Sequence, residues 1–181
     1  LDRITCIHPK EGVGDTSVPN LQLMDVDLFN EPVDWSTLDQ KGDTSIVLGN
    51  GVKVKQVKFD GVRSWNNVPE KLNLAHQNNY LTFRFIAITL NLPGKIKYQY
   101  KLDGMDAHWS HLTSDNFATY GNLPPGKYIF KVKAMNSERY WSQELTYPFT
   151  IRHPWWQTWW AYGLYVCLLT GVVYAALQFF K

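Results

Sequence analysis

The feature that most constrains this chain is its C-terminal part, where no charged residue occurs from Trp155 to Phe180. About 20 apolar residues in a helix cross a hydrocarbon core roughly 30 Å thick, and this run exceeds that length. Its first part is rich in the amphipathic rings that settle at the level of lipid headgroups. These membrane-interface candidates are Trp155, Trp156, Trp159 and Trp160. We therefore predict a single transmembrane helix over residues 154–181.

Two other structures fit an apolar helix of this length: a helix buried in a protein core and a helix lying in the membrane interface. The interfacial helix is disfavoured because it needs one polar face, and this segment has none. Pro154 suits a first helical turn, where its missing N–H group is not needed, so we expect the helix to begin there. Its orientation does not follow from charge, because Arg152 and Lys181 flank it almost symmetrically.

The body of the chain, residues 19–153, has the alternating pattern of β-strands with one buried face. The alternation is clearest over residues 95–102, 127–134 and 145–151, and weaker over 21–29, 44–48, 52–59 and 72–75. Tyr80 to Leu90 is apolar on both faces, which predicts a central strand covered on both sides. Asn50-Gly51 is typical of a tight hairpin turn. About seven or eight short strands without a helix predict an all-β fold, an immunoglobulin/fibronectin-like antiparallel β-sandwich followed by the single transmembrane α-helix.

Charge and cysteine content exclude several classes of function. The formal net charge is only +2, too small for a face that neutralises phosphates, so we expect no nucleic-acid binding by this fragment. Cys6 and Cys167 fall in segments expected to lie in different media, so no disulfide is predicted. The first residues contain no apolar signal region, and we expect a fragment of a longer protein. Residues 1–18 are predicted to be a linker or the end of a preceding domain.

Three stretches together carry a family likeness: Tyr-Gln-Tyr-Lys-Leu-Asp-Gly-Met-Asp-Ala-His-Trp at 98–109, Ala-Thr-Tyr-Gly-Asn-Leu-Pro-Pro-Gly-Lys-Tyr-Ile-Phe-Lys-Val-Lys-Ala at 118–134, and Pro-Trp-Trp-Gln-Thr-Trp-Trp at 154–160. Their order and spacing resemble the three-tyrosine (Y_Y_Y) domain of hybrid two-component sensors in gut Bacteroides-type bacteria. In that family the domain lies between periplasmic β-propellers and the transmembrane helix. The resemblance is specific over residues 72–160 and extends to Pro19.

The resemblance implies a location, partners and a role. It places the chain at the bacterial inner membrane, with the sandwich in the periplasm, residues 1–18 near upstream β-propellers of the same chain, and the helix in the lipid bilayer. It implies a homodimer, a glycan ligand bound by or shared with the propellers, and output through a histidine kinase and a DNA-binding regulator. Propellers and kinase lie outside this sequence, so the fragment is expected to couple them without catalysis or cofactors.

Five residues of these motifs are predicted to be scaffold. Large rings at Tyr98, Tyr100 and Tyr128 can face inward while each hydroxyl reaches a backbone group. Trp109, after the Asp-Gly turn, is expected to fill the gap between the sheets. Tyr120, ahead of Leu-Pro-Pro-Gly, resembles a tyrosine corner that attaches a loop to the preceding strand.

One loop carries residue types that occur in metal sites and active sites. His108 and His111, with Asp103, Asp106 and Asp115, are residue types that bind metals, but their spacing fits solvated turn residues better. Asp103 and Asp106 do not form a glycosidase pair, because such pairs face each other across a cleft. Motifs for phosphate binding, nucleophilic attack or zinc proteolysis are absent from the sequence. We therefore predict no catalytic residue and no metal.

Two surface features allow more than one interpretation. Lysines occupy the polar faces of two predicted strands. They form either a basic strip that binds an anionic glycan or partner, or a solvated sheet face, and we favour the solvated face. The lysines are Lys95, Lys97, Lys101, Lys127, Lys131 and Lys133. Rings in turns are expected to be exposed and able to stack on sugars or protein; they are Trp35, Trp65, Tyr140 and Trp141. The sequence thus predicts a coupling domain, with a membrane-anchored carbohydrate-binding or adhesion module as the alternative, and an enzyme that hydrolyses glycans as a third hypothesis.

Overall fold

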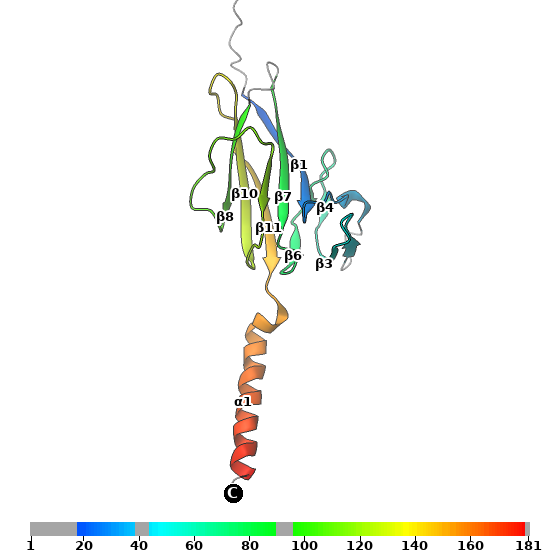
Figure 1. The fold of residues 1–181 in the computed structure, drawn as a ribbon, viewed down its shortest axis with the longest axis vertical. Helices are drawn as coiled ribbons and strands as arrows, with labels where there is room; N and C mark the ends of the chain where they lie inside the picture. Colours follow the sequence, from blue (N-terminus) through cyan, green and yellow to red (C-terminus); the bar gives the residue numbers. More distant parts are fainter. Residues whose placement is uncertain (1–17, 39–43, 90–95, 180–181) are drawn as a thin grey trace, which may run out of the picture.

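The alternation of apolar and polar residues is realised as strands of two facing sheets, from which a long helix projects (Figure 1). The computed structural model describes residues 18–38, 44–89 and 96–179. Within them the strands are β1 (Asn20–Leu28), β2 (Thr44–Val47), β3 (Lys53–Val57), β4 (Gly61–Val62), β5 (Pro69–Glu70), β6 (Asn73–Ala75), β7 (Leu81–Ile88), β8 (Lys97–Asp103), β9 (Phe117–Tyr120), β10 (Gly126–Met135) and β11 (Leu145–Arg152). The helical segments in the same ranges are two short 3-10 turns, η1 (Trp35–Thr37) and η3 (Trp155–Gln157), and the helix α1 (Trp159–Phe179). The predicted fold class is confirmed.

The two layers of the sandwich differ in their strand order. The first sheet has the order β1-β7-β9, and both of its strand pairs are antiparallel. The second has the order β6-β11-β10-β8, in which β6 runs parallel to β11 while β10 is antiparallel to both of its neighbours. The last strand before the helix, β11, is therefore an inner strand, hydrogen-bonded on both sides.

Aromatic rings dominate the core between the sheets. Phe83 of β7 stacks on Phe130 of β10 with ring centroids 4.2 Å apart and planes 9° apart. Phe85 of β7 contacts Tyr98 of β8 edge-on, with centroids 5.1 Å apart. Each ring buries a large apolar area, so these contacts across the two layers hold the sheets in one fixed arrangement.

Strand β7 lies in the middle of its sheet, as predicted, but only one of its faces is covered. Phe83 and Phe85 point into the core, whereas Ile86 and Ile88 are 40% and 54% exposed on the opposite face. The expectation of a strand covered on both sides is therefore wrong. An apolar residue on each face is necessary for a doubly covered strand but not sufficient, because the covering layer has to come from elsewhere in the chain.

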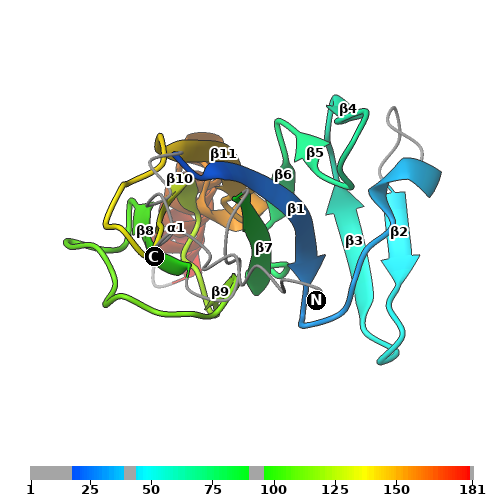
Figure 2. The same cartoon turned by 90° about the horizontal axis from the view of Figure 1, so that it is seen from above.

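Three strands were not predicted: β4, β5 and β9. β4 and β5 have two residues each, too few for an alternating pattern, and β9 has four. β4 and β5 pair with each other, as do β2 and β3 across the predicted Asn50-Gly51 hairpin, where Gly51 has a φ of 81°. Both pairs lie beside the sandwich on the side of β1 (Figure 2), and we call residues 44–70 the side extension. The predictions for Cys6, Lys95 and Lys181, and for a linker or preceding domain up to residue 17, concern residues outside the described ranges.

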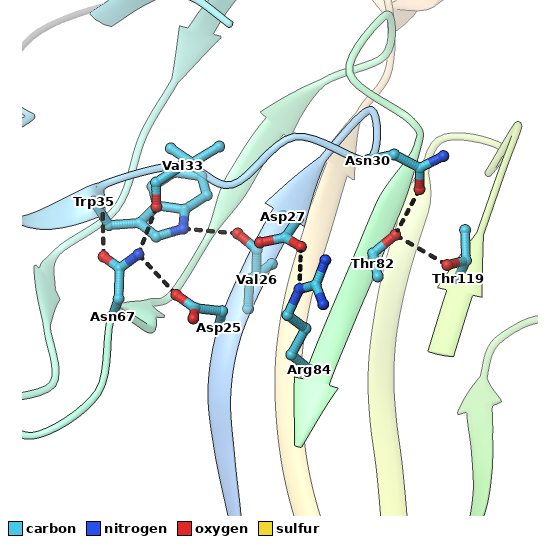
Figure 3. Close-up of polar contacts among 10 residues, drawn as sticks. All are labelled: Asp25, Val26, Asp27, Asn30, Val33, Trp35, Asn67, Thr82, Arg84 and Thr119. Carbon is cyan, nitrogen blue, oxygen red and sulfur yellow. Dashed lines mark hydrogen bonds and ion pairs between the residues drawn. The ribbon is translucent and has the colours of Figure 1, made fainter. Parts of the chain in front are cut away.

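Asn67 is one of several residues that attach the side extension to the sandwich (Figure 3). Its amide oxygen accepts a hydrogen bond from the Trp35 backbone N–H at 2.9 Å. Its amide nitrogen donates to Oδ1 of Asp25 at 2.8 Å and to the Val33 carbonyl at 2.6 Å. The Trp35 indole N–H donates to the Val26 carbonyl of β1 at 2.8 Å. These bonds cover the outer edge of β1, where an unpaired strand edge would otherwise be open to aggregation.

Trp35 corrects a second expectation, since the sequence placed it among the exposed rings. Its side chain is fully buried and contacts Phe59 edge-on, with centroids 5.6 Å apart. The turn η1 carries the ring onto β1, because the Asp34 carboxylate caps the turn through the Ser36 backbone N–H at 3.1 Å. Burial of a turn residue depends on what the rest of the chain packs over it, which the local sequence does not show.

Polar contacts also join the strands of the first sheet on its outer face (Figure 3). Nε of Arg84 lies 2.6 Å from Oδ2 of the buried Asp27, which links β7 to β1. Oγ1 of Thr82 lies 3.0 Å from Oγ1 of Thr119, which links β7 to β9. Cross-strand pairs of this kind hold the register of the sheet.

The helix begins later than predicted. Pro154 is extended and buried, with φ and ψ of −63° and 150°, and precedes η3 rather than opening the long helix. Thr158 is also extended, and its carbonyl accepts hydrogen bonds from the N–H groups of Ala161 and Tyr162, so it caps α1. Proline suits the position before η3 because its missing N–H group is not needed at the start of a helical turn. The chain then makes this one short turn before α1 begins. Among the described helices, α1 is long and apolar enough to cross a membrane, and almost none of it is buried.

Candidate functional site

The segment that joins the sandwich to α1 is the candidate site, because β11 leads into it from the middle of a sheet. Tyr147 and Phe149 of β11 are buried in the core, and Ile151 is buried next to the end of the strand. β11 pairs with β10 from Leu145 to Ile151 and with β6 from Thr150 to Arg152. A strand held on both edges and on one face cannot slide by itself, so its end moves only with the sandwich.

Arg152, the last residue of β11, is fastened to the side extension. Its Nη2 donates a hydrogen bond to the carbonyl oxygen of Gln56, which is 96 residues away in the chain. Gln56 has a φ of 60°, and β3 has one extra residue there, because Thr44 pairs with Val57 and Ile46 with Val54. A β-bulge of this kind turns a backbone group out of the regular ladder. The bulge therefore places the Gln56 carbonyl where the guanidinium of Arg152 reaches it.

The turn after β6 ties the same elements together from another side. Nδ2 of the buried Asn78 donates to the Lys55 carbonyl of β3 at 2.7 Å, and its backbone N–H donates to the Ala75 carbonyl at 2.8 Å. His76, in this turn, contacts Trp156 of η3 edge-on, with ring centroids 5.2 Å apart. The ends of β3, β6 and β11 and the turn η3 thus form one connected base, which we call the junction.

The four tryptophans predicted to lie at the membrane interface are exposed on the sandwich side of α1. Trp155 and Trp156 belong to η3 and contact each other edge-on at 5.7 Å, and Trp159 and Trp160 open α1. Exposed tryptophans in this number are unusual in water and common at headgroup level. Their role at an interface stays a prediction.

The three motif tyrosines lie on the core face of the second sheet. The Tyr98 hydroxyl accepts a hydrogen bond from the Ala87 N–H at 3.2 Å, and the Tyr128 hydroxyl donates to the Pro124 carbonyl at 2.6 Å. Tyr98 and Tyr128 are buried, while Tyr100 is partly buried and packs against the core. The expected hydroxyl-to-backbone bonds are present for Tyr98 and Tyr128, and burial raises the pKa of the Tyr128 hydroxyl.

Tyr120 does not make the bond of a tyrosine corner. Its hydroxyl donates to the carboxylate oxygen Oδ2 of Asp106 at 2.8 Å, and that oxygen also accepts the Leu102 N–H at 2.8 Å. Burial, followed by the neighbouring Asp106, raises the pKa of Tyr120 far above its usual value. Tyr128, bonded to a carbonyl four residues upstream, makes the corner-like contact instead.

Trp109 does not fill the gap between the sheets, and that expectation is wrong. Nζ of Lys133 lies 4.4 Å from the Trp109 ring centroid and 4.5 Å from that of Trp141. Lys133 alternates with the buried Val132 and Ala134, so both rings lie over the outer face of the second sheet. The cation holds them there by cation–π attraction, and the loop that carries Trp109 folds outward.

The carboxylates considered for metal binding or catalysis form structural contacts. Asp103 pairs with Nζ of Lys101 at 2.8 Å and of Lys131 at 2.9 Å, and these lysines lower its pKa. Asp115 accepts a hydrogen bond from Oγ1 of Thr113 at 2.8 Å. His108 and His111 are exposed, and in the described part of the chain no three His, Cys, Asp or Glu side chains are grouped to hold a metal ion.

The lysine strip is partly neutralised. β8 and β10 are neighbours, as the strip requires, and Lys101 lies directly opposite Lys131. Both pair with Asp103, and Lys131 also reaches Glu144 at 3.3 Å. Among the predicted exposed rings, Tyr140 and Trp141 are exposed and Trp65 is 94% exposed.

The sequence indicates one residue of the junction but not its partner. Arg152 was recognised as a charged residue beside the membrane segment, but its partner Gln56 carries no signal that a sequence pattern shows. The bulge at Gln56 needs neither glycine nor proline, so the local sequence did not mark it.

Comparisons with known proteins agree with this architecture. Residues 89–152 match the Y_Y_Y domain family. Histidine kinase P4 of Formosa agariphila is 28% identical over 111 residues, which are 61% of this chain and 8% of that protein. The chain therefore spans less than a tenth of the length of this relative.

Two solved structures share the fold. The extracellular domain of the putative one component system BT4673 from B. thetaiotaomicron matches 77% of this chain and 16% of its own, with a TM-score of 0.55 and 22% identity. The extracellular domain of the putative hybrid two component system BT3049 from the same organism matches 76% of this chain and 16% of its own, with a TM-score of 0.51 and 21% identity.

Proposed function

We propose that this chain, whose residues 89–152 match the Y_Y_Y domain family, is the membrane-proximal coupling domain of a transmembrane sensor histidine kinase. In this proposal the sandwich lies in the periplasm and α1 crosses the bacterial inner membrane. Upstream propellers of the same protein sense glycans, and the sandwich passes their movement through α1 to a cytoplasmic kinase. The domain itself carries out no catalysis.

The observation that carries this proposal is the construction of the junction. β11 is an inner strand, its last residue Arg152 is bonded to Gln56 of β3, and only six residues separate it from Trp159, the first residue of α1. The buried Pro154 and the contact of Trp156 with His76 fill part of this short segment. Displacement of the sandwich therefore reaches α1 with little slack, because packed interiors transmit strain.

We further propose that the domain acts as a symmetric homodimer. The outer face of the first sheet supports this, because exposed apolar side chains gather on its neighbouring strands β7 and β9. They include Ile86, Ile88 and Phe117. A symmetric pair is the commonest assembly for such proteins and would bury this face.

The coupling proposal is tested by lengthening the junction in the full-length protein. A flexible Gly-Ser insertion after Arg152 is expected to abolish ligand-induced kinase activity, because the base of the sandwich and α1 would then move independently. The same insertion after Trp65, in the exposed turn between β4 and β5, serves as the control and should leave induction intact. Wild-type induction after the Arg152 insertion would refute the proposed mechanism.

A membrane-anchored carbohydrate-binding module is the second candidate, and it is favoured by the nearly complete exposure of Trp65. An indole ring that projects from a turn offers a flat apolar face to a sugar. Under this hypothesis Trp65→Ala removes binding of the purified chain to glycan arrays, whereas under the coupling hypothesis the array signal is independent of Trp65.

A further inference from the structure

A small cavity lies at the junction, on the side of the sandwich from which α1 departs. Its volume is about 250 Å³, and it is lined by the ends of β6 and β11, by the bulge of β3 and by the start of η3. Arg152, His153, His76 and Trp155 are among its lining residues. In Figure 1, β11 leads down to α1, and β6 ends beside β11 at the base of the sandwich.

The cavity has positive character and no countercharge. None of its lining residues is acidic, and no salt bridge joins Arg152 to a carboxylate in the described ranges of the chain. Nη2 of Arg152 is held by the Gln56 carbonyl, while its Nε is buried and has no hydrogen-bond partner among the described residues. An N–H donor buried without a partner is costly, and this partly exposed guanidinium has no carboxylate partner in the described ranges, so an anionic acceptor would complete its hydrogen bonding.

The place and size of the cavity limit what that anion is. Trp155 lines it and Trp156 lies beside it, so under the proposed function, on which this step rests, it faces the headgroups of the adjoining leaflet. Its volume is below the roughly 300–1,000 Å³ of ordinary small-molecule pockets, so the cavity is too small for an oligosaccharide. A phosphate with its short glycerol substituent is of suitable size, and planar guanidinium groups bind phosphate oxygens well.

We propose that this cavity binds the phosphate group of an anionic phospholipid headgroup, with Arg152 as the charged donor. His76 and His153 flank the phosphate and offer ring N–H groups, and the rings of η3 pack against the glycerol and upper acyl chains. A bound lipid then fixes η3 between the sandwich and the bilayer. The membrane thereby becomes part of the rigid path from β11 to α1.

The test measures lipid binding by the full chain in detergent, using native mass spectrometry. The probes are phosphatidylglycerol, phosphatidylcholine with the same acyl chains, and inorganic phosphate. Wild type should bind phosphatidylglycerol about tenfold more tightly than phosphatidylcholine, and Arg152→Gln should lose about that factor, as expected for one hydrogen-bonded charge pair. Arg139→Gln is the matched control, because it removes the same charge from an exposed turn at the opposite end of β10 and β11, and its binding should equal that of wild type.

Equal binding of the two lipids by wild type overturns the proposal without any variant, and so does undiminished binding by a folded Arg152→Gln chain. Displacement of phosphatidylglycerol by inorganic phosphate at similar affinity would identify a soluble anion as the ligand and also overturn it. Flotation of the chain with vesicles separates this inference from the proposed function. A chain that inserts into both kinds of vesicle without a preference leaves the coupling function standing, whereas a chain that fails to insert contradicts that function itself.

Discussion

Replacing Phe83 with alanine is expected to remove the main contact between the two sheets. Phe83 is fully buried and stacks on Phe130 with centroids 4.2 Å apart, and it also contacts Tyr120, Tyr147 and Phe149. Truncating a buried phenylalanine costs about 3–5 kcal/mol, and loss of a stacked pair places this site in the upper part of that range, at about 4–5 kcal/mol. Domains of ordinary stability have about 5–15 kcal/mol in total, so the variant should fold but with little reserve.

Thermal unfolding of the full chain in detergent micelles measures this loss. Near-ultraviolet circular dichroism is the suitable signal, because it reports the packing of aromatic rings and is insensitive to helix that persists in the micelle. At about 3–4 °C per kcal/mol for a domain of this size, the midpoint should fall by roughly 12–20 °C.

The matched control is Tyr140→Ala, since Tyr140 also carries a six-membered aromatic ring but is 46% exposed, in the turn between β10 and β11 and away from the proposed dimer face. Surface substitutions of this kind change stability by about 0.5 kcal/mol or less, so its midpoint should stay close to that of wild type. Equal shifts for the two variants would refute the view that the stacked rings join the sheets.

Three further predictions concern polar contacts. Burial raises the pKa of the Asp25 carboxyl above its usual 3.8. The folded state then binds this proton more tightly than the unfolded state, so folding stability is lost as the pH rises through the folded-state pKa. Asp25→Asn should therefore raise the melting temperature at neutral pH and have less effect in acid. Tyr120→Phe removes the donor to Asp106 and should cost about 1.5–3 kcal/mol in urea unfolding with an unchanged m-value, and no change in the midpoint would contradict that assignment. Asn67→Ala breaks three hydrogen bonds and should speed hydrogen exchange at the Trp35 indole, whereas an unchanged rate would show that Asn67 does not attach the side extension.

Much of the fold could be predicted because strands with long alternating patterns carry their own signal. The ranges 127–134 and 145–151 became β10 and β11 within one or two residues at each end. β4 and β5 escaped prediction because two residues cannot show a period of two. Their pairing is decided by the chain on either side, which brings Gly61 opposite Glu70.

The candidate site was less predictable, because its contacts join residues far apart in the chain. Arg152 meets Gln56 only after β3, β6 and β11 have come together at the base of the sandwich. Trp109 is expected inside on account of its size, but the cation of Lys133 holds it outside. The energy of such a contact belongs to the pair, so neither local sequence contains it.

By itself, the sequence determined the elements whose cause is local: strands with one apolar face, and an uncharged helix headed by tryptophans that water does not favour on a soluble surface. The tertiary structure alone decided which rings are buried, where Trp35 lies, that Tyr128 rather than Tyr120 reaches back to its own loop, and that β3 bulges toward Arg152. The physical reason is that periodicity reports the environment of each residue averaged along its own strand, whereas burial and partner choice depend on segments that only folding brings together.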